Sequence, residues 1–196
     1  MSYTDFQTHT LDDGSLFHAG WLPAALRPST AATFDALWDL HPDAYHRIVM
    51  AGRPVDTPRW QQAYGMDYRY TGRVNRALPV PAVYAPYLTW AQSHLDHRLN
   101  GLLLNWYDGK KGHYIGRHRD STAGMVDGVP IVTISLGEVR AFRLRPWRQP
   151  GFIDFTAGHG AVFVLPTTTN RAWTHEIPRS KQAIGRRISL TLRAFT

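Results

Sequence analysis

The stretch RRISLTLRAF, at residues 186–195, has two faces of opposite character. Side chains alternate across a β-strand, so one face is apolar and the other is polar. The apolar face holds Ile188, Leu190, Leu192 and Ala194, and the polar face holds Arg187, Ser189, Thr191 and Arg193. A polar strand face usually points to water. The alternative is that it lines a small barrel, where a dicarboxylate would match the guanidinium groups, because an unpaired buried charge is costly.

A second stretch, LLLNWY at residues 102–107, repeats this alternation. Leu103, Asn105 and Tyr107 share one side, opposite Leu102, Leu104 and Trp106. Further short β-rich segments are PIVTISLG (130–137), VRAFRLR (139–145), GFIDF (151–155) and GAVFVLP (160–166). Helices are predicted before residue 100, at STAATFDALWDL (29–40) and YAPYLTWAQSHLDHRL (84–99). The pattern predicts an α+β, mainly β fold: a jelly roll with flanking N-terminal helices.

The composition is that of one folded domain. The chain has 196 residues, of which 43% are hydrophobic, so it can bury a core. The absence of cysteine excludes disulfides, thiolate zinc sites and cysteine nucleophiles. No apolar run is long enough to span a membrane, and the polar, acidic N-terminus argues against a signal peptide. We therefore expect an intracellular protein with no membrane contact and no obligate protein partner.

The net charge of +7 is unevenly spread. Residues 1–57 hold three arginines against seven aspartates, a net charge of −4, and the remainder holds 19 basic and 8 acidic residues, a net charge of +11. A basic region of this kind attracts polyanions, which makes nucleic acid a candidate partner. The alternative is a basic surface that is merely solvated.

The segment GHYIGRHRDSTAG, at residues 112–124, suggests a metal site. On an extended chain His118 and Asp120 project the same way. With one distant histidine they would form the two-imidazole, one-carboxylate set that holds Fe(II) in non-haem oxygenases, although zinc accepts similar ligands. A His-x-Asp pair also arises by chance in a chain with ten histidines.

The third ligand must come from elsewhere in the chain. His113 faces the other way on a continuous strand and is assigned to structure or substrate contact. His159 lies between glycines and is typical of a turn. His175 is favoured, because a predicted strand precedes it and the arginine-bearing strand follows it.

These motifs, taken in order, resemble the AlkB family of Fe(II)/2-oxoglutarate-dependent dioxygenases. The ordered set is Asn105-x-Tyr107, His118-x-Asp120, His175 and the polar face of residues 186–193. Upstream, PRWQQAYGMDYRYTG (58–72) is similar to the substrate-side stretch of the branch that repairs duplex DNA. The resemblance covers residues 58–195, and residues 1–57 are not diagnostic.

The resemblance implies a double-stranded β-helix that binds Fe(II) and 2-oxoglutarate. It implies that His118, Asp120 and His175 hold the metal. The far carboxylate of 2-oxoglutarate would meet Arg187, helped by Tyr107 and Ser189, while Arg193 and Asn105 would line the metal end. The implied domain is single, with an N-terminal extension (1–57), a substrate-side segment with a helix (58–100) and a catalytic core (101–196).

The implied activity is oxidative dealkylation of N-alkylated bases in nucleic acid, DNA in the first place, with release of aldehyde, succinate and CO2. Tyr68 and Tyr70 would contact the base, which must leave the stack to reach an enclosed metal. Arg59 and Arg119 are assigned to substrate binding. They belong to a basic set that could grip phosphates, with Arg69, Arg73, Arg76, Lys110, Lys111 and Arg117.

Two departures from the family pattern bear on substrate and co-substrate. Thr122 stands where the family often has an acidic residue that helps to read the base, and Asp127 is a possible substitute. Ser189 stands where asparagine is common. Alternative functions are an Fe(II)/2-oxoglutarate hydroxylase of a small metabolite or protein side chain, and a non-catalytic nucleic-acid-binding module.

Overall fold

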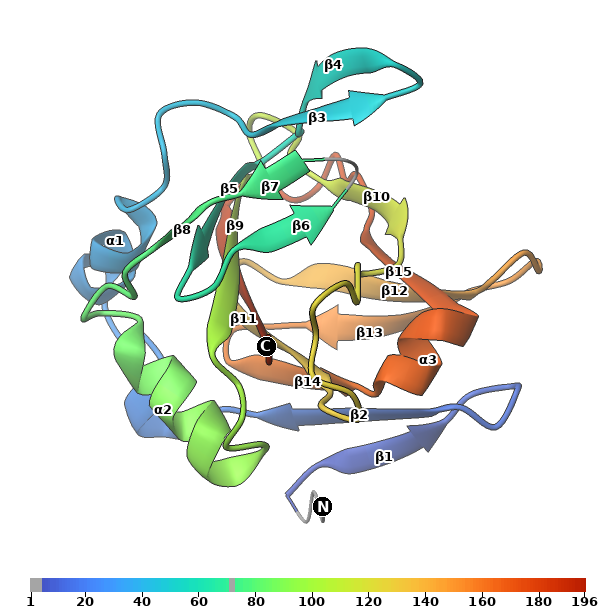
Figure 1. The fold of residues 1–196 in the computed structure, drawn as a ribbon. Coiled ribbons are helices and arrows are strands. Elements are labelled where there is room, and N and C mark those ends of the chain that lie inside the picture. The colour runs from blue at the N-terminus through green and yellow to red at the C-terminus, as the bar shows by residue number, and fades with distance from the viewer. Residues whose placement is uncertain (1–4, 71–72) are drawn as a thin grey trace.

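Two β-sheets face each other and form the body of the molecule, for which the computed structural model describes residues 5–70 and 73–196 (Figure 1). The large sheet has the strand order β1 (Gln7–Thr10), β2 (Leu16–Trp21), β14 (Ala161–Leu165), β11 (Ile131–Gly137), β16 (Arg186–Arg193), β9 (Gly101–Asp108), β5 (Trp60–Tyr64) and β8 (Ala77–Leu78). The small sheet has the order β10 (Ile115–His118), β15 (Trp173–Ile177), β12 (Arg140–Pro146) and β13 (Ile153–Ala157). This arrangement confirms the predicted jelly roll.

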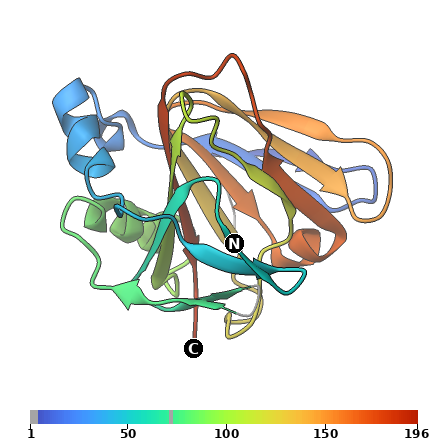
Figure 2. The ribbon, with the colours of Figure 1, turned by 90° about the horizontal axis from the view of Figure 1, so that it is seen from above.

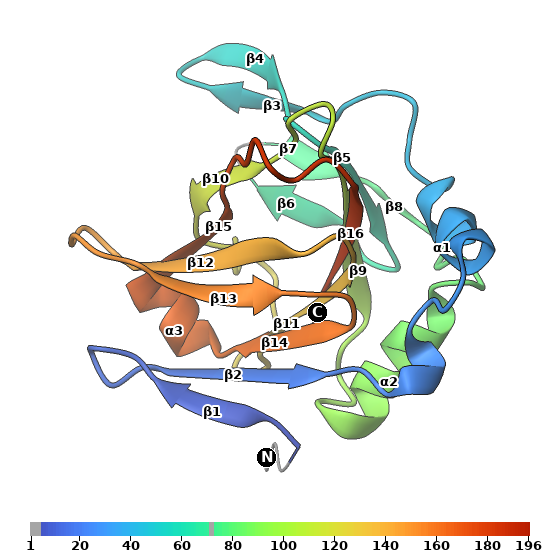
Figure 3. The ribbon, with the colours of Figure 1, turned by 180° about the vertical axis from the view of Figure 1, so that it is seen from behind.

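Two helices cover the outer face of the large sheet on the side of β9 and β5 (Figures 2 and 3). Helix α1 (Ala31–Trp38) begins after Thr30, whose hydroxyl accepts the backbone N–H of Thr33 in a capping box. Helix α2 (Ala85–His94) has a proline in its first turn. Trp38 and Trp90 pack here against the apolar faces of β9, β11 and β16. Both predicted helices are confirmed.

Both faces of strand β16 are buried. Ile188, Leu190 and Leu192 are fully buried under the helices. On the opposite face, Arg187 and Arg193 have exposed fractions of only 0% and 2%. The polar face therefore lines the space between the sheets, which confirms the barrel-interior alternative.

Aromatic side chains fill one part of that space. The rings of Phe142 and Phe163 stack with centroids 4.7 Å apart, and Phe17 stacks on both. Leu144 and Trp173 belong to the same buried cluster. This apolar packing excludes water from part of the interior, so the polar groups gather in the remainder.

More strands precede residue 100 than the sequence pattern predicted. Strands β1 and β2 extend the large sheet through pairing of β2 with β14. Two hairpins follow, β3 (Arg47–Met50) with β4 (Arg53–Asp56), and β6 (Tyr68–Tyr70) with β7 (Arg73–Asn75). Strand β4 is exposed throughout, and β1 nearly so, so neither shows the alternation that reveals a half-buried strand. The β3–β4 hairpin projects from one end of the barrel (Figure 1).

No helix among residues 5–70 and 73–196 is long and apolar enough to cross a bilayer.

Candidate active site

Two histidines lie opposite each other on paired strands. His118 ends β10 and pairs in register with His175 of β15, after a bulge in β10. Their ring centroids are 4.2 Å apart. The Nδ1 of His118 lies 2.8 Å from the carbonyl oxygen of Gly116, to which a protonated Nδ1 donates, leaving the Nε2 lone pair free for a metal. His175 packs on the ring of Phe142, with an interplanar angle of 15°.

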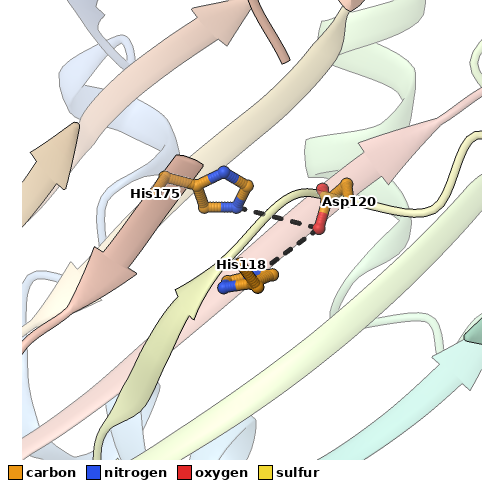
Figure 4. Close-up of side chains that lie close together, drawn as sticks. All are labelled: His118, Asp120 and His175. Carbon is orange, nitrogen blue, oxygen red and sulfur yellow. Dashed lines mark ion pairs between the residues drawn. The ribbon is translucent and has the colours of Figure 1, made fainter. Parts of the chain in front are cut away.

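Asp120 completes the cluster just beyond the end of β10 (Figure 4). Its Oδ1 lies 3.5 Å from Nε2 of His118 and 3.7 Å from Nε2 of His175. One ligand atom from each residue lies within 4.8 Å of the others. The side chain of Asn170, on helix α3 (Thr167–Ala172), accepts the backbone N–H of Asp120 and donates to its carbonyl, both at 3.0 Å. This double contact fixes the backbone that carries the carboxylate.

The protonation states suit a divalent cation. Burial lowers the pKa of His175 to about 3, so its imidazole is neutral at pH 7. Burial alone would raise the pKa of Asp120, but the adjacent Arg193 guanidinium and the hydrogen bond with His118 hold it well below its usual range. Arg193 Nη2 donates to Asp120 Oδ2 at 2.5 Å. The cluster therefore presents a carboxylate and at least one neutral imidazole, which are the forms that bind metal.

Arg187 is a buried cation with a free guanidinium edge. Its Nε donates to the hydroxyl of Ser135 at 2.9 Å, and among the described residues neither Nη1 nor Nη2 has a hydrogen-bond partner. Burial lowers its pKa to about 10, so it still carries its charge at pH 7. Burying a charge without a partner costs free energy. The free edge has the geometry to receive a carboxylate.

One cavity of about 460 Å³ joins these groups. The metal cluster and Arg187 both line it. So do the other predicted co-substrate residues and the predicted base-contacting tyrosines, namely Asn105, Tyr107, Ser189, Arg193, Tyr68 and Tyr70. The structure thus gathers these sequence-predicted residues into one place, from five strands and the loop after β10.

The two tyrosines stack beside the metal cluster. Tyr68 and Tyr70 have ring centroids 5.2 Å apart, and the Arg193 guanidinium lies 4.3 Å from the Tyr68 ring. The Tyr68 hydroxyl accepts the backbone N–H of Ser121 at 3.2 Å. Tyr68 is buried, whereas Tyr70 is partly exposed and accepts a hydrogen bond from the Gln61 amide. Tyr70 is therefore the more accessible of the two rings.

Three sequence expectations need correction. Arg59 is buried in the cavity wall, so it does not belong to a surface set that grips phosphates. Asp127 does not line the cavity, and its side chain is 95% exposed beside Arg171, so it is no substitute for a base-reading acid there. A strand was predicted before His175, but His175 lies within strand β15 and the segment before it is helix α3. This helix was not predicted, because its six residues are too few to show a helical period.

The two other histidines considered as metal ligands, His113 and His159, have structural contacts instead. His113 is buried, with Nε2 2.9 Å from the Tyr45 hydroxyl, and its Nδ1 accepts the backbone N–H of Asp108. His159 accepts the backbone N–H of Gly137 through Nδ1, in the turn before β14. Neither belongs to the metal cluster.

Sequence reasoning missed residues that support the site. Ser135 orients Arg187, and its alternation with Thr133 in PIVTISLG was an available signal. Asn170 was not detectable, because its contact with Asp120 spans 50 residues and no motif announces it. Gln61 was hidden in a stretch taken only as substrate-side sequence.

Comparison with known proteins defines the class. The chain belongs to the 2OG-Fe(II) oxygenase superfamily, whose family model matches residues 19–193. It is 28% identical to human DNA oxidative demethylase ALKBH2 over 165 residues, which cover 76% of this chain and 61% of that protein. It is also 28% identical to rat alpha-ketoglutarate-dependent dioxygenase alkB homolog 3, over 69% of this chain and 50% of that protein. These matches confirm the resemblance to the AlkB family. The chain spans less than two thirds of the length of either relative.

Solved structures share the fold. A structure titled as that of OsALKBH1 aligns with a TM-score of 0.56 and 14% identity, covering 96% of this chain and all of that one. A 2OG-Fe(II) oxygenase family protein from Burkholderia pseudomallei aligns with a TM-score of 0.56 and 20% identity, covering 90% and 84% of the two chains.

Family membership implies Fe(II) as the metal and 2-oxoglutarate as the co-substrate. The residues present fit both groups. Two imidazoles and a carboxylate match a ferrous ion with open positions. The unpartnered edge of Arg187, inside the same cavity, matches the far carboxylate of a dicarboxylic acid.

Proposed function

We propose that this chain carries out oxidative dealkylation of N-alkylated nucleic-acid bases, with DNA as the first candidate, inside the cell. The observation that carries the proposal is one cavity that holds a two-histidine, one-carboxylate cluster, an unpaired buried arginine and a stacked tyrosine pair. The similarity to proteins named DNA oxidative demethylase supports the choice of substrate.

In this proposal His118, Asp120 and His175 hold Fe(II). Arg187 binds the far carboxylate of 2-oxoglutarate, with Tyr107 and Ser189 beside it. Arg193 and Asn105 line the metal end. When bound, the iron and 2-oxoglutarate supply, with O2, the oxidation of the alkyl carbon, yielding succinate, CO2 and an aldehyde.

The chain's own residues orient the reactants. Arg193 keeps Asp120 ionised by pairing with one of its oxygens, so the other oxygen stays available to the metal. Tyr70 replaces stacking for a base that has left the helix. Arg119 is exposed at the rim, where it can contact a phosphate. Apolar packing around Phe142 limits water near the metal.

The direct test is mass spectrometry of alkylated oligonucleotides incubated with the protein, Fe(II), ascorbate and 2-oxoglutarate. We expect loss of the alkyl group with matching formation of succinate. Asp120→Ala should abolish both, whereas His97→Ala, at an exposed position after α2, should change neither. Retention of every alkyl group while free 2-oxoglutarate is consumed would reject a nucleic-acid substrate and favour a small metabolite or protein side chain.

A further inference from the structure

Among the described residues, half of the arginines outside the cavity pair with a carboxylate, but only one of the five that line the cavity does. Away from the cavity, seven arginines pair with a carboxylate: Arg47, Arg76, Arg98, Arg143, Arg145, Arg171 and Arg186. Five arginines line the cavity, and among the described residues only Arg193 has such a partner. The other four are Arg59, Arg117, Arg119 and Arg187. The cavity wall is therefore cationic.

Three of these unpaired charges meet an anion under the proposed function. Arg187 receives the far carboxylate of 2-oxoglutarate. Arg117 and Arg119 are exposed at the rim, and among the described residues their contacts are neutral: the Thr174 hydroxyl, backbone carbonyls and, for Arg119, the Trp147 ring. Both charges can therefore approach phosphates. Arg59 remains, and neither anion accounts for it.

Arg59 is buried, with an exposed fraction of 5%, and its contacts are neutral. Its Nε donates to Asn105 Oδ1 at 2.7 Å, and its Nη2 donates to Gln61 Oε1 at 3.1 Å. No hydrogen bond from Nη1 is found within residues 5–70 and 73–196. Because its partners are amide oxygens, the full positive charge remains in the wall.

Arg59 lies next to the place proposed for the substrate base. Asn105 connects it to the co-substrate side, and Gln61 connects it to Tyr70, because the same amide that accepts from Arg59 donates to the Tyr70 hydroxyl. A base stacked on Tyr70 would thus lie beside the guanidinium. The ring centroid of His46 is 5.8 Å from that of Tyr70, and the positive charge of Arg59 also acts on His46. Burial lowers the pKa of His46, and the charges of Arg59 and Arg73 lower it further.

Within the described part of the chain, no carboxylate near Arg59 is free to pair with a cationic base. Asp120 is the only acidic residue that lines the cavity among the described residues, and it is engaged by Arg193 and the metal cluster. A base that is itself cationic would meet uncompensated repulsion in a low-dielectric wall. A neutral base with carbonyl oxygens on its pairing edge would accept a hydrogen bond from Arg59.

We propose that this enzyme prefers neutral, carbonyl-bearing lesions, such as 1-methylguanine and 3-methylthymine, over the cationic 1-methyladenine and 3-methylcytosine, with Arg59 as the residue that sets the preference. The inference rests on the proposed function and narrows its substrate class.

The first test is binding, which separates recognition from the intrinsic reactivity of each lesion. Four single-stranded oligonucleotides, identical except for one lesion, compete against the unmodified strand under anaerobic conditions with Fe(II) and 2-oxoglutarate. We expect the neutral lesions to bind at least about tenfold more tightly than the cationic ones. Equal binding, or tighter binding of the cationic lesions, would overturn the proposal.

Two substitutions at one position separate charge from shape. Arg59→Met removes the charge and should reduce the preference to within about threefold, whereas Arg59→Lys keeps the charge and should retain most of it. An unchanged preference in a folded Arg59→Met variant contradicts the assignment of Arg59.

A third test uses the unmodified protein and varies the pH. The cation of 1-methyladenine loses its extra proton in alkaline solution, which makes the base neutral. In a mixture with 1-methylguanine, the relative turnover of 1-methyladenine should then rise several-fold. A constant ratio would contradict the proposal. Removal of lesions without preference defeats this inference alone, whereas no removal of any of the four lesions defeats the proposed function as well.

Discussion

Among single residues, Arg187 carries a buried charge that the stability of the fold does not explain. Arg187 is fully buried, yet neither terminal nitrogen has a partner among the described residues. Folding alone gives no reason to keep such a group, because an apolar residue of similar volume is often no less stable at a buried charged position. Under the proposed function, the far carboxylate of 2-oxoglutarate would supply the reason.

Substitution of Arg187 should weaken co-substrate binding without unfolding the protein. Arg187→Met removes a charged, two-pronged contact worth about 2–3 kcal/mol, so the Kd for 2-oxoglutarate should rise roughly 30- to 150-fold. The measurement is anaerobic titration of the iron-loaded protein, with circular dichroism to establish folding. The control is Arg186→Met, because this neighbour is partly exposed and pairs with Asp35 instead. Equal affinity in both variants would reject the assignment.

Tyr70 should matter for the oligonucleotide and not for the co-substrate. Tyr70→Ala removes a stacking surface worth about 1–3 kcal/mol per base, so turnover of an alkylated oligonucleotide should fall about tenfold or more. Decarboxylation of 2-oxoglutarate without substrate should be largely kept. Tyr70→Phe, which loses only the hydroxyl that accepts from Gln61, should retain most turnover. Parallel losses of both activities in Tyr70→Ala would indicate a structural role.

At the scale of the element, the metal cluster depends on how two strands and a short helix meet. The pairing of β10 with β15 sets His118 opposite His175, and α3 holds the Asp120 backbone through Asn170. Helix α3 spans only six residues and contacts β15 directly. Its contribution is to position the one ligand that lies outside a strand.

Loss of the Asn170 side chain should loosen the metal cluster. Asn170→Ala removes both contacts to the Asp120 backbone, and changes to groups that orient metal ligands cost about 10- to 100-fold in metal affinity. Competition with a chelator for Fe(II) measures this value. Thr168→Ala is the matched control, because Thr168 is an exposed residue of the same helix. Identical affinity in the two variants would show that α3 does not position the ligand.

The elements that sequence predicted best are those with long, regular alternation. Strands β9 and β16 each span eight residues and pair with each other along their length, so opposite faces meet different surroundings and the pattern is clear. The short strands before residue 100 lack such contrast. Strand β4 is exposed at all four positions, so no apolar face marks it.

The site residues that could be predicted are those that a short stretch of sequence marks by its spacing. The polar face of β16 and the His118-x-Asp120 pair were visible from spacing alone, because each lies within a few residues of chain. The burial of Arg59 was not visible, since it follows from contacts with Asn105, 46 residues away. The preference for a lesion class that we draw from this residue needed the structure.

At the scale of the whole molecule, the charge distribution suits a polyanionic partner. The chain carries a net charge of +7, and the basic excess lies after residue 57. Arg117 and Arg119, exposed at the rim of the cavity, have no carboxylate partner among the described residues. Binding of phosphates there releases counterions and makes affinity depend on salt.

Oligonucleotide affinity should therefore fall steeply with salt, and the rim arginines should account for part of the slope. Arg119→Ala should reduce the slope of log K against log salt by about 0.7 for a single strand. Arg98→Ala, beyond α2 and paired with Asp96, should leave the slope unchanged. Absence of binding even at low salt would favour a small-molecule substrate.

An anaerobic titration of the protein with Fe(II) and 2-oxoglutarate, followed by visible absorption, tests the metal site most directly. Chelation of iron by 2-oxoglutarate in this site should give a weak charge-transfer band in the intact chain and in His97→Ala. Removal of a ligand in His118→Ala or Asp120→Ala should abolish the band. An undiminished band in folded forms of both ligand variants would contradict the assignment of His118, Asp120 and His175 as the metal site.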